Sequence, residues 1–193
     1  MQQDQINIQG NDALIVVDIQ NDFCPGGALP IPRGDEVVPV ANSWISAAQT
    51  SGVPVYCSRD FHPHEHPSFQ GQGGSWPQHC VQDTWGAEFH PSLQVPKEAR
   101  VVTKGVRFDK DQNSAFDETG LAGHLEREGI GRLIVLGLAL DVCVRATVLD
   151  GLSAGFEAVV ILEGCRAVTE DSGRETIDEL ERSGAICSSG ALT

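Results

Sequence analysis

The chain has few basic side chains and no long hydrophobic run. Its 193 residues include 13 lysines and arginines against 27 aspartates and glutamates, so the formal net charge is −14 at pH 7. A surface of this charge repels nucleic acid and anionic membranes, and neither is expected as a partner. No apolar stretch approaches the roughly 20 residues that a transmembrane helix needs. The charge does not oppose the binding of a small neutral ligand. The sequence is compatible with a homo-oligomer.

The sequence also lacks any pair of cysteines with the spacing of a redox motif. Its six cysteines stand far apart along the chain, which argues against a thiol oxidoreductase with a C-x-x-C motif. The first residues, Met1 to Gln5, are polar and contain no basic stretch, so no secretory signal is expected. We therefore expect a cytoplasmic protein with reduced thiols rather than a secreted one with disulfides.

Short apolar runs alternate with longer mixed segments along the chain. This alternation predicts an α/β fold with a mostly parallel sheet that helices cover on both faces. The predicted strands are Ala13–Val17, Val53–Ser58, Val101–Thr103, Leu133–Leu136, Ala158–Leu162 and Ala185–Cys187. The predicted helices are Asp35–Ser51, Leu121–Glu128, Val144–Leu152 and a last helix that Ser172 caps, with Glu175 at the capping-box position. No repeat or linker is visible, so residues 1–193 are expected to form a single domain.

Residues suited to catalysis come directly after, or shortly after, the ends of predicted strands. Parallel α/β sheets bind ligands at the carboxyl ends of their strands. Asp18 follows the first strand, Lys104 the third and Cys143 the fourth. These are the groups that acyl transfer by a thiol requires, because the thiol attacks, a base takes its proton and a cation stabilises charge. Taken singly, each also fits a surface or capping charge, but their coincidence favours the catalytic interpretation.

Cys143 stands between the apolar run Leu133–Leu136 and the helical segment Val144–Leu152. The sequence therefore predicts a strand-to-helix turn with Cys143 at the N-terminus of the helix. Unpaired N–H groups and the helix dipole favour a thiolate at such a position. The alternative interpretation is an inert core residue, which is the common role of a free cysteine.

Histidines are concentrated in one long loop region. Four of the six lie within 18 residues of each other, between positions 62 and 79. Asp60 and His62 are two residues apart, so in extended backbone their side chains leave the same face. A more distant histidine, His79, can complete a three-ligand metal site with open positions for water or substrate. A solvated, histidine-rich loop is the alternative interpretation.

Taken together, these segments resemble the nicotinamidase/pyrazinamidase group of the isochorismatase-like cysteine hydrolase superfamily. They cover most of the chain in the order and at the spacing of that family. The matching segments are Val17–Phe23, Asp60–Pro63, His66–Phe69, Trp76–Val81, Phe89–Leu93, Lys104–Gly105, Gly137–Ala139 and Asp141–Val144. No one segment is specific to the family, but the combination is.

The resemblance implies a three-layer α/β/α fold with a six-stranded sheet and a catalytic triad of Asp18, Lys104 and Cys143. It also implies a cis peptide between Leu138 and Ala139, with the backbone N–H groups of Ala139 and Cys143 as the oxyanion hole. Such a site hydrolyses nicotinamide to nicotinate and ammonia through a thioester, which is a reaction of NAD salvage, and acts likewise on pyrazinamide.

By the same resemblance, Asp60, His62 and His79 bind one divalent metal ion. Zinc is the expected ion, with iron and manganese as alternatives. Relatives differ at the position of His66, so its role as a ligand stays open. Family members without a metal generally lack the pattern of an aspartate followed two residues later by a histidine, and this chain has it.

The resemblance places Phe23 and Trp76 on either side of the substrate ring, with Leu138 also at the pocket. Relatives commonly carry an aromatic residue where Asn113 stands, so Asn113 either shapes the pocket or points to solvent. This departure leaves open a related hydrolase of another small amide or N-carbamoyl compound. A non-enzymatic metal- or ligand-binding protein is disfavoured because all three triad residues are present.

Overall fold

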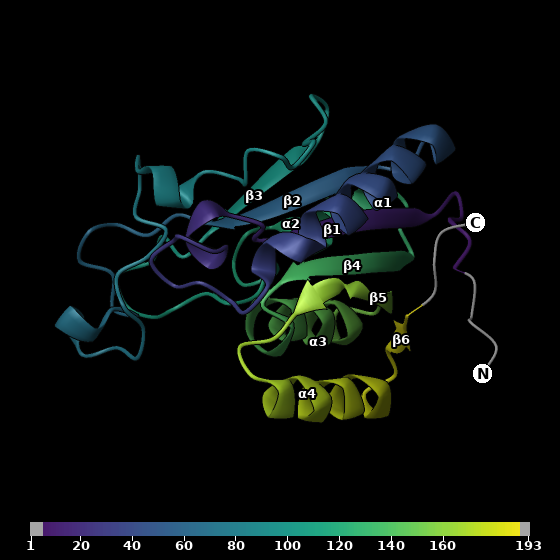
Figure 1. The fold of residues 1–193 in the computed structure, drawn as a ribbon. Helices are drawn as coiled ribbons and strands as arrows, with labels where there is room; N and C mark the ends of the chain where they lie inside the picture. Colours follow the sequence, from purple (N-terminus) through teal and green to yellow (C-terminus); the bar gives the residue numbers. More distant parts are fainter. Residues whose placement is uncertain (1–5, 190–193) are drawn as a thin grey trace.

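A computed structural model describes residues 6–189 of the chain, in which six parallel strands form one sheet (Figure 1). The strands are β1 (Asp12–Val17), β2 (Val55–Asp60), β3 (Arg100–Lys104), β4 (Arg132–Leu138), β5 (Glu157–Arg166) and β6 (Ile186–Ser188). Their order across the sheet is β3-β2-β1-β4-β5-β6. The predicted parallel sheet is confirmed, and the carboxyl ends of its strands meet at one edge. Within residues 6–189, no helix is long and apolar enough to span a membrane.

Helices cover both faces of this sheet, as predicted. They are α1 (Val37–Ser51), α2 (Leu121–Arg127), α3 (Arg145–Ser153) and α4 (Glu170–Arg182). On one face, Leu133 of β4 lies against Gly151 of α3. On the other face, Gly164 of β5 lies against Val40 of α1. The described part of the chain is therefore a three-layer α/β/α arrangement.

Strand β1 occupies the centre of the sheet, and all six of its residues are buried. This burial explains its continuous apolar run, because a central parallel strand is covered on both faces. Val17, its last residue, is in register with Ser58 on β2 and with Gly137 on β4. The residue after β1 is therefore held between the ends of two neighbouring strands.

The last helix begins earlier than the sequence predicted. Ser172 is not its N-cap, because the side chain of Thr169 accepts a hydrogen bond from the backbone N–H of Ser172 and caps α4 instead. Ser172 takes the third helical position and completes the capping box in place of Glu175. Two hydroxyl residues three apart both suit a cap, and the pattern did not distinguish them.

The chain between β4 and α3 also differs from the prediction. After the cis peptide between Leu138 and Ala139, residues Leu140–Val144 form a π-helical turn, and only then does α3 begin, at Arg145. Cys143 lies inside this turn rather than at the first residue of a helix. Such turns are rare and occur frequently at functional sites.

Candidate active site

The carboxyl edge of the sheet brings Asp18, Lys104 and Cys143 together. Lys104, the last residue of β3, places Nζ 2.7 Å from Oδ2 of Asp18 and 3.5 Å from Sγ of Cys143. Asp18 directly follows β1 and has a φ of 47°, a left-handed conformation that aspartate tolerates better than most residues. All three side chains are buried. The three residues that the sequence places after separate strands thus form one contiguous group.

Lys104 carries a second ion pair, with the carboxylate of Asp60 at 2.6 Å. Burial alone would lower the pKa of Lys104, but Asp18 and Asp60 together raise it well above its usual value. Burial also opposes the ionisation of Asp60, yet Lys104 and His62 outweigh it and lower the pKa of Asp60. The lysine is therefore a permanent cation between two carboxyl groups.

The electrostatics of Cys143 differ from the sequence-based expectation of a thiolate. Burial raises the pKa of Cys143 well above its usual value, and Lys104 offsets only part of this effect. Burial likewise raises the pKa of Asp18, again against the influence of Lys104. A thiol that stays protonated at neutral pH needs a base to become a nucleophile, and Asp18 is the adjacent carboxylate.

Two polar residues that the sequence reasoning missed hold this group in place. The hydroxyl of Ser58 donates a hydrogen bond of 2.7 Å to Oδ1 of Asp18. The side-chain amide of Gln20 donates to the backbone carbonyl of Asp60 at 2.7 Å and accepts from the backbone N–H of Asp60 at 2.8 Å. The register of β1 against β2 could have revealed Ser58, but nothing in the sequence pattern pointed to Gln20.

Asp60, His62 and His79 form a buried cluster next to the lysine. One potential ligand atom from each lies within 4.8 Å of the others, and Nε2 of His62 lies 3.7 Å from Oδ2 of Asp60. His66 stacks close by, with its ring centroid 4.2 Å from that of His62. The alternative interpretation of a solvated loop is wrong for these three residues, since His62, His66 and His79 are all buried.

The donor set and its hydrogen bonds suit a metal ion. Backbone carbonyls hold Nδ1 of two rings, that of His62 at 2.8 Å from the oxygen of Gly105 and that of His79 at 2.7 Å from the oxygen of Pro77. Metal-binding histidines are oriented in this way by a second hydrogen bond on the far nitrogen. One carboxylate and two imidazoles are ligands that zinc accepts in sites with open positions.

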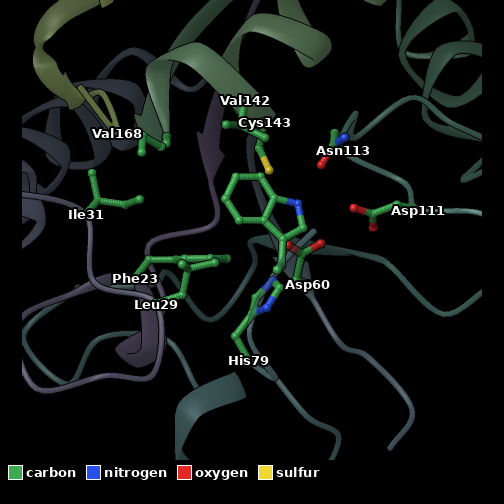
Figure 2. A pocket seen from close by; sticks show the side chains of 12 residues that line it. Phe23, Leu29, Ile31, Asp60, His79, Asp111, Asn113, Val142, Cys143 and Val168 are labelled. Atoms are coloured by element: carbon green, nitrogen blue, oxygen red, sulfur yellow. The ribbon is translucent and has the colours of Figure 1, made fainter. Parts of the chain in front are cut away.

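A cavity opens beside Cys143 and has two unlike sides (Figure 2). Phe23, Leu29, Ile31 and Val168 form an apolar side, while Asp60, Asp111 and Asn113 lie on the polar side. Trp76, His79, Ala139, Val142 and Cys143 complete the lining. A flat, partly polar molecule matches this division of the walls.

The chain is similar to known proteins over most of its length. The model of the isochorismatase domain matches residues 12–191. The chain belongs to the isochorismatase domain family. Among its relatives, the nicotinamidase of Escherichia coli is 44% identical, over 81% of this chain and 83% of that protein.

Two solved structures of this family are close to the chain throughout. One is a pyrazinamidase of Pyrococcus horikoshii in complex with zinc, with a TM-score of 0.90 and 38% identity, over 95% of this chain and 99% of that one. The other is a protein of L. infantum in complex with nicotinate, with a TM-score of 0.91 and 34% identity, over 98% of each chain.

Three of the four pocket residues that the family resemblance implies line the cavity, and the fourth does not. Phe23, Trp76 and Asn113 line the cavity. Leu138, the last residue of β4, does not line it. Asp111 also lines the cavity, although no motif or spacing pointed to it.

Proposed function

We propose that this member of the isochorismatase domain family is a nicotinamidase that hydrolyses nicotinamide to nicotinate and ammonia, and pyrazinamide to pyrazinoate. The observation that carries the proposal is the position of Cys143 beside Lys104 and Asp18 at the wall of a cavity. The aromatic rings of Phe23 and Trp76 in the same lining suit a pyridine ring. The relatives named above act on, or are bound to, compounds of this class.

In the proposed mechanism, Asp18 accepts the thiol proton of Cys143 and the sulfur attacks the carboxamide carbon. Backbone N–H groups of Ala139 and Cys143 donate hydrogen bonds to the developing oxyanion. Asp18 then gives its proton to the leaving nitrogen, so that ammonia departs and a thioester remains. Asp18 next takes a proton from water as the water attacks the thioester. Nicotinate leaves, and the sulfur recovers that proton.

Lys104 contributes to both halves of the reaction through its contacts with Asp18 and Cys143. Its ammonium keeps Asp18 close to the sulfur, because it lies within 3.5 Å of both groups. It also offsets part of the cost of ionising Asp18 in a buried site. Lys104 therefore acts as a fixed cation and transfers no proton itself.

Asp60, His62 and His79 are proposed to hold one divalent ion, with zinc as the first candidate and iron or manganese as alternatives. When bound, such an ion supplies a Lewis-acid site that can orient the pyridine nitrogen of the substrate. The support for this assignment is the buried ligand cluster and the carbonyl groups that orient two of its rings.

The test is ammonia release from a panel of amides by the purified protein. Nicotinamide and pyrazinamide are expected to be hydrolysed, while benzamide, which lacks the ring nitrogen, and an N-carbamoyl amino acid are expected to be poor substrates. A higher kcat/KM for the carbamoyl compound than for nicotinamide would support the alternative hydrolase and overturn the proposal.

A further inference from the structure

The hydrogen bonds of the three clustered histidines decide which ring nitrogen carries the proton. A backbone carbonyl can only accept a hydrogen bond. Since Nδ1 of His62 faces the carbonyl of Gly105 and Nδ1 of His79 faces that of Pro77, both neutral rings carry their proton on Nδ1. Their Nε2 atoms therefore have a free lone pair and can bind a metal ion.

His66 has the opposite arrangement. The backbone N–H of Ser68 donates to Nδ1 of His66 at 3.3 Å, and the hydroxyl of Ser68 lies 2.7 Å from the same nitrogen. A backbone N–H can only donate, so Nδ1 must be the nitrogen with the lone pair. The neutral ring of His66 therefore carries its proton on Nε2, which makes that atom a hydrogen-bond donor and not a metal ligand.

The Nε2–H group of His66 needs a hydrogen-bond acceptor. Nε2 of His66 is buried and has no hydrogen-bond partner within residues 6–189. A ring nitrogen of His66, one of His62 and a carboxylate oxygen of Asp111 all lie within 4.8 Å of one another. No direct hydrogen bond joins His66 and Asp111, and polar groups at such a separation are commonly bridged by a water molecule.

We propose that His66 is not a ligand of the ion, and that its Nε2–H and the carboxylate of Asp111 together hold one water molecule beside the imidazole of His62. His66 and Asp111 are then positioning residues, and the ion's protein ligands are Asp60, His62 and His79. The inference uses the metal site of the proposed function, but its evidence is the hydrogen-bonding pattern alone.

The direct test is long-range ¹H–¹⁵N NMR of the zinc-loaded protein, in which each ring nitrogen reports whether it carries a proton. We expect His66 to show a proton on Nε2 and none on Nδ1, and His62 and His79 to show the reverse, with zinc on Nε2. A proton on Nδ1 of His66 would overturn the proposal. The measurement does not depend on turnover, so a failure here and a failure of the nicotinamidase activity are distinguishable.

A second test compares zinc affinities by competition with a chromophoric chelator. His66→Ala is expected to weaken zinc binding by roughly 10- to 100-fold, the usual effect of removing a group outside the ligand set. His66→Gln keeps an N–H donor and is expected to restore most of that loss, whereas His79→Ala should show no tight binding. If His66→Gln loses zinc as completely as His79→Ala does, His66 is a ligand and the proposal is wrong.

Discussion

Lys104 Nζ lies 2.6 Å from Oδ1 of Asp60, and this contact joins the catalytic group to the proposed metal site. The same ammonium is 2.7 Å from Oδ2 of Asp18, so one buried cation is paired with two buried carboxyl groups. Buried charges of this kind are tolerated only when they are paired. The strand register explains how the contact forms, since Asp60 on β2 and Lys104 on β3 are direct neighbours.

Lys104→Met is therefore expected to lower stability as well as activity. Removing the ammonium leaves Asp18 and Asp60 as two adjacent carboxyl groups without a counter-charge, a change that typically costs about 3–5 kcal/mol. Urea denaturation followed by circular dichroism measures the loss. The matched control is Lys110→Met, because Lys110 is half exposed and its ion pair is with Asp117 at the surface. Equal stability of the two variants would show that Lys104 does not hold the carboxylates together.

Cys143→Ala is expected to abolish ammonia release while leaving the fold and the metal content unchanged. The side chain removed is small, and its sulfur is the protein group that bonds to the substrate carbon in the proposed mechanism. Elemental analysis and circular dichroism check that the variant is intact. Cys187→Ser is the control, since Cys187 lies on β6 away from the cavity lining. Substantial hydrolysis by the alanine variant would exclude a covalent thioester.

Asp18→Asn is expected to reduce kcat by about 100-fold or more, which is the common contribution of general acid–base catalysis. The amide is nearly the same shape as the carboxylate but cannot take the proton of Cys143. Ser58→Ala removes only the hydrogen bond to Asp18 and should have a much smaller effect. Near-normal activity of Asp18→Asn at neutral pH would mean that another group moves the proton.

The sequence predicted the fold well, because the fold depends on local patterns. Each apolar run became a strand, and the parallel arrangement placed the residues that follow β1, β3 and β4 at one edge. The boundaries were less accurate. Strand β5 continues to Arg166, four residues beyond the predicted end at Leu162, because its polar last residues still pair with β4.

What the sequence could not predict depends on three-dimensional packing. Burial raises the pKa of Cys143, and that burial is a property of the folded chain that the residues around Cys143 do not reveal. Asp111 lines the cavity and lies near His62 and His66, and no spacing in the sequence encodes that proximity. The different hydrogen bonds of His66 and His62 likewise become visible only when their surroundings are known.

Gly105→Ala is expected to weaken zinc binding without any change to a ligand. Gly105 has a φ of +69°, and an added Cβ would lie 2.4 Å from Cε1 and 2.6 Å from Nδ1 of His62. The ring must therefore shift, and it also loses its alignment with the Gly105 carbonyl, so a loss of roughly 10-fold or more in affinity is expected. Gly71→Ala is the control, because a Cβ at Gly71 meets no atom within 4 Å. Unchanged zinc affinity in Gly105→Ala would mean that this backbone contact does not position His62.

Trp76 and Asn113 are expected to set substrate preference, because both line the cavity beside Cys143. Aromatic contact with a flat ring contributes roughly 0.5–1.5 kcal/mol beyond area burial, so Trp76→Ala should raise KM for nicotinamide several-fold.

Asn113, on the polar side of the cavity (Figure 2), offers hydrogen bonds instead of an aromatic face and leaves more room than an aromatic side chain would. Wild type should therefore accept a ring-substituted nicotinamide that Asn113→Tyr rejects. The measurement is kcat/KM for nicotinamide, pyrazinamide and the bulkier analogue in both proteins. If the ratios among the three substrates do not change, Asn113 has no part in selecting the substrate.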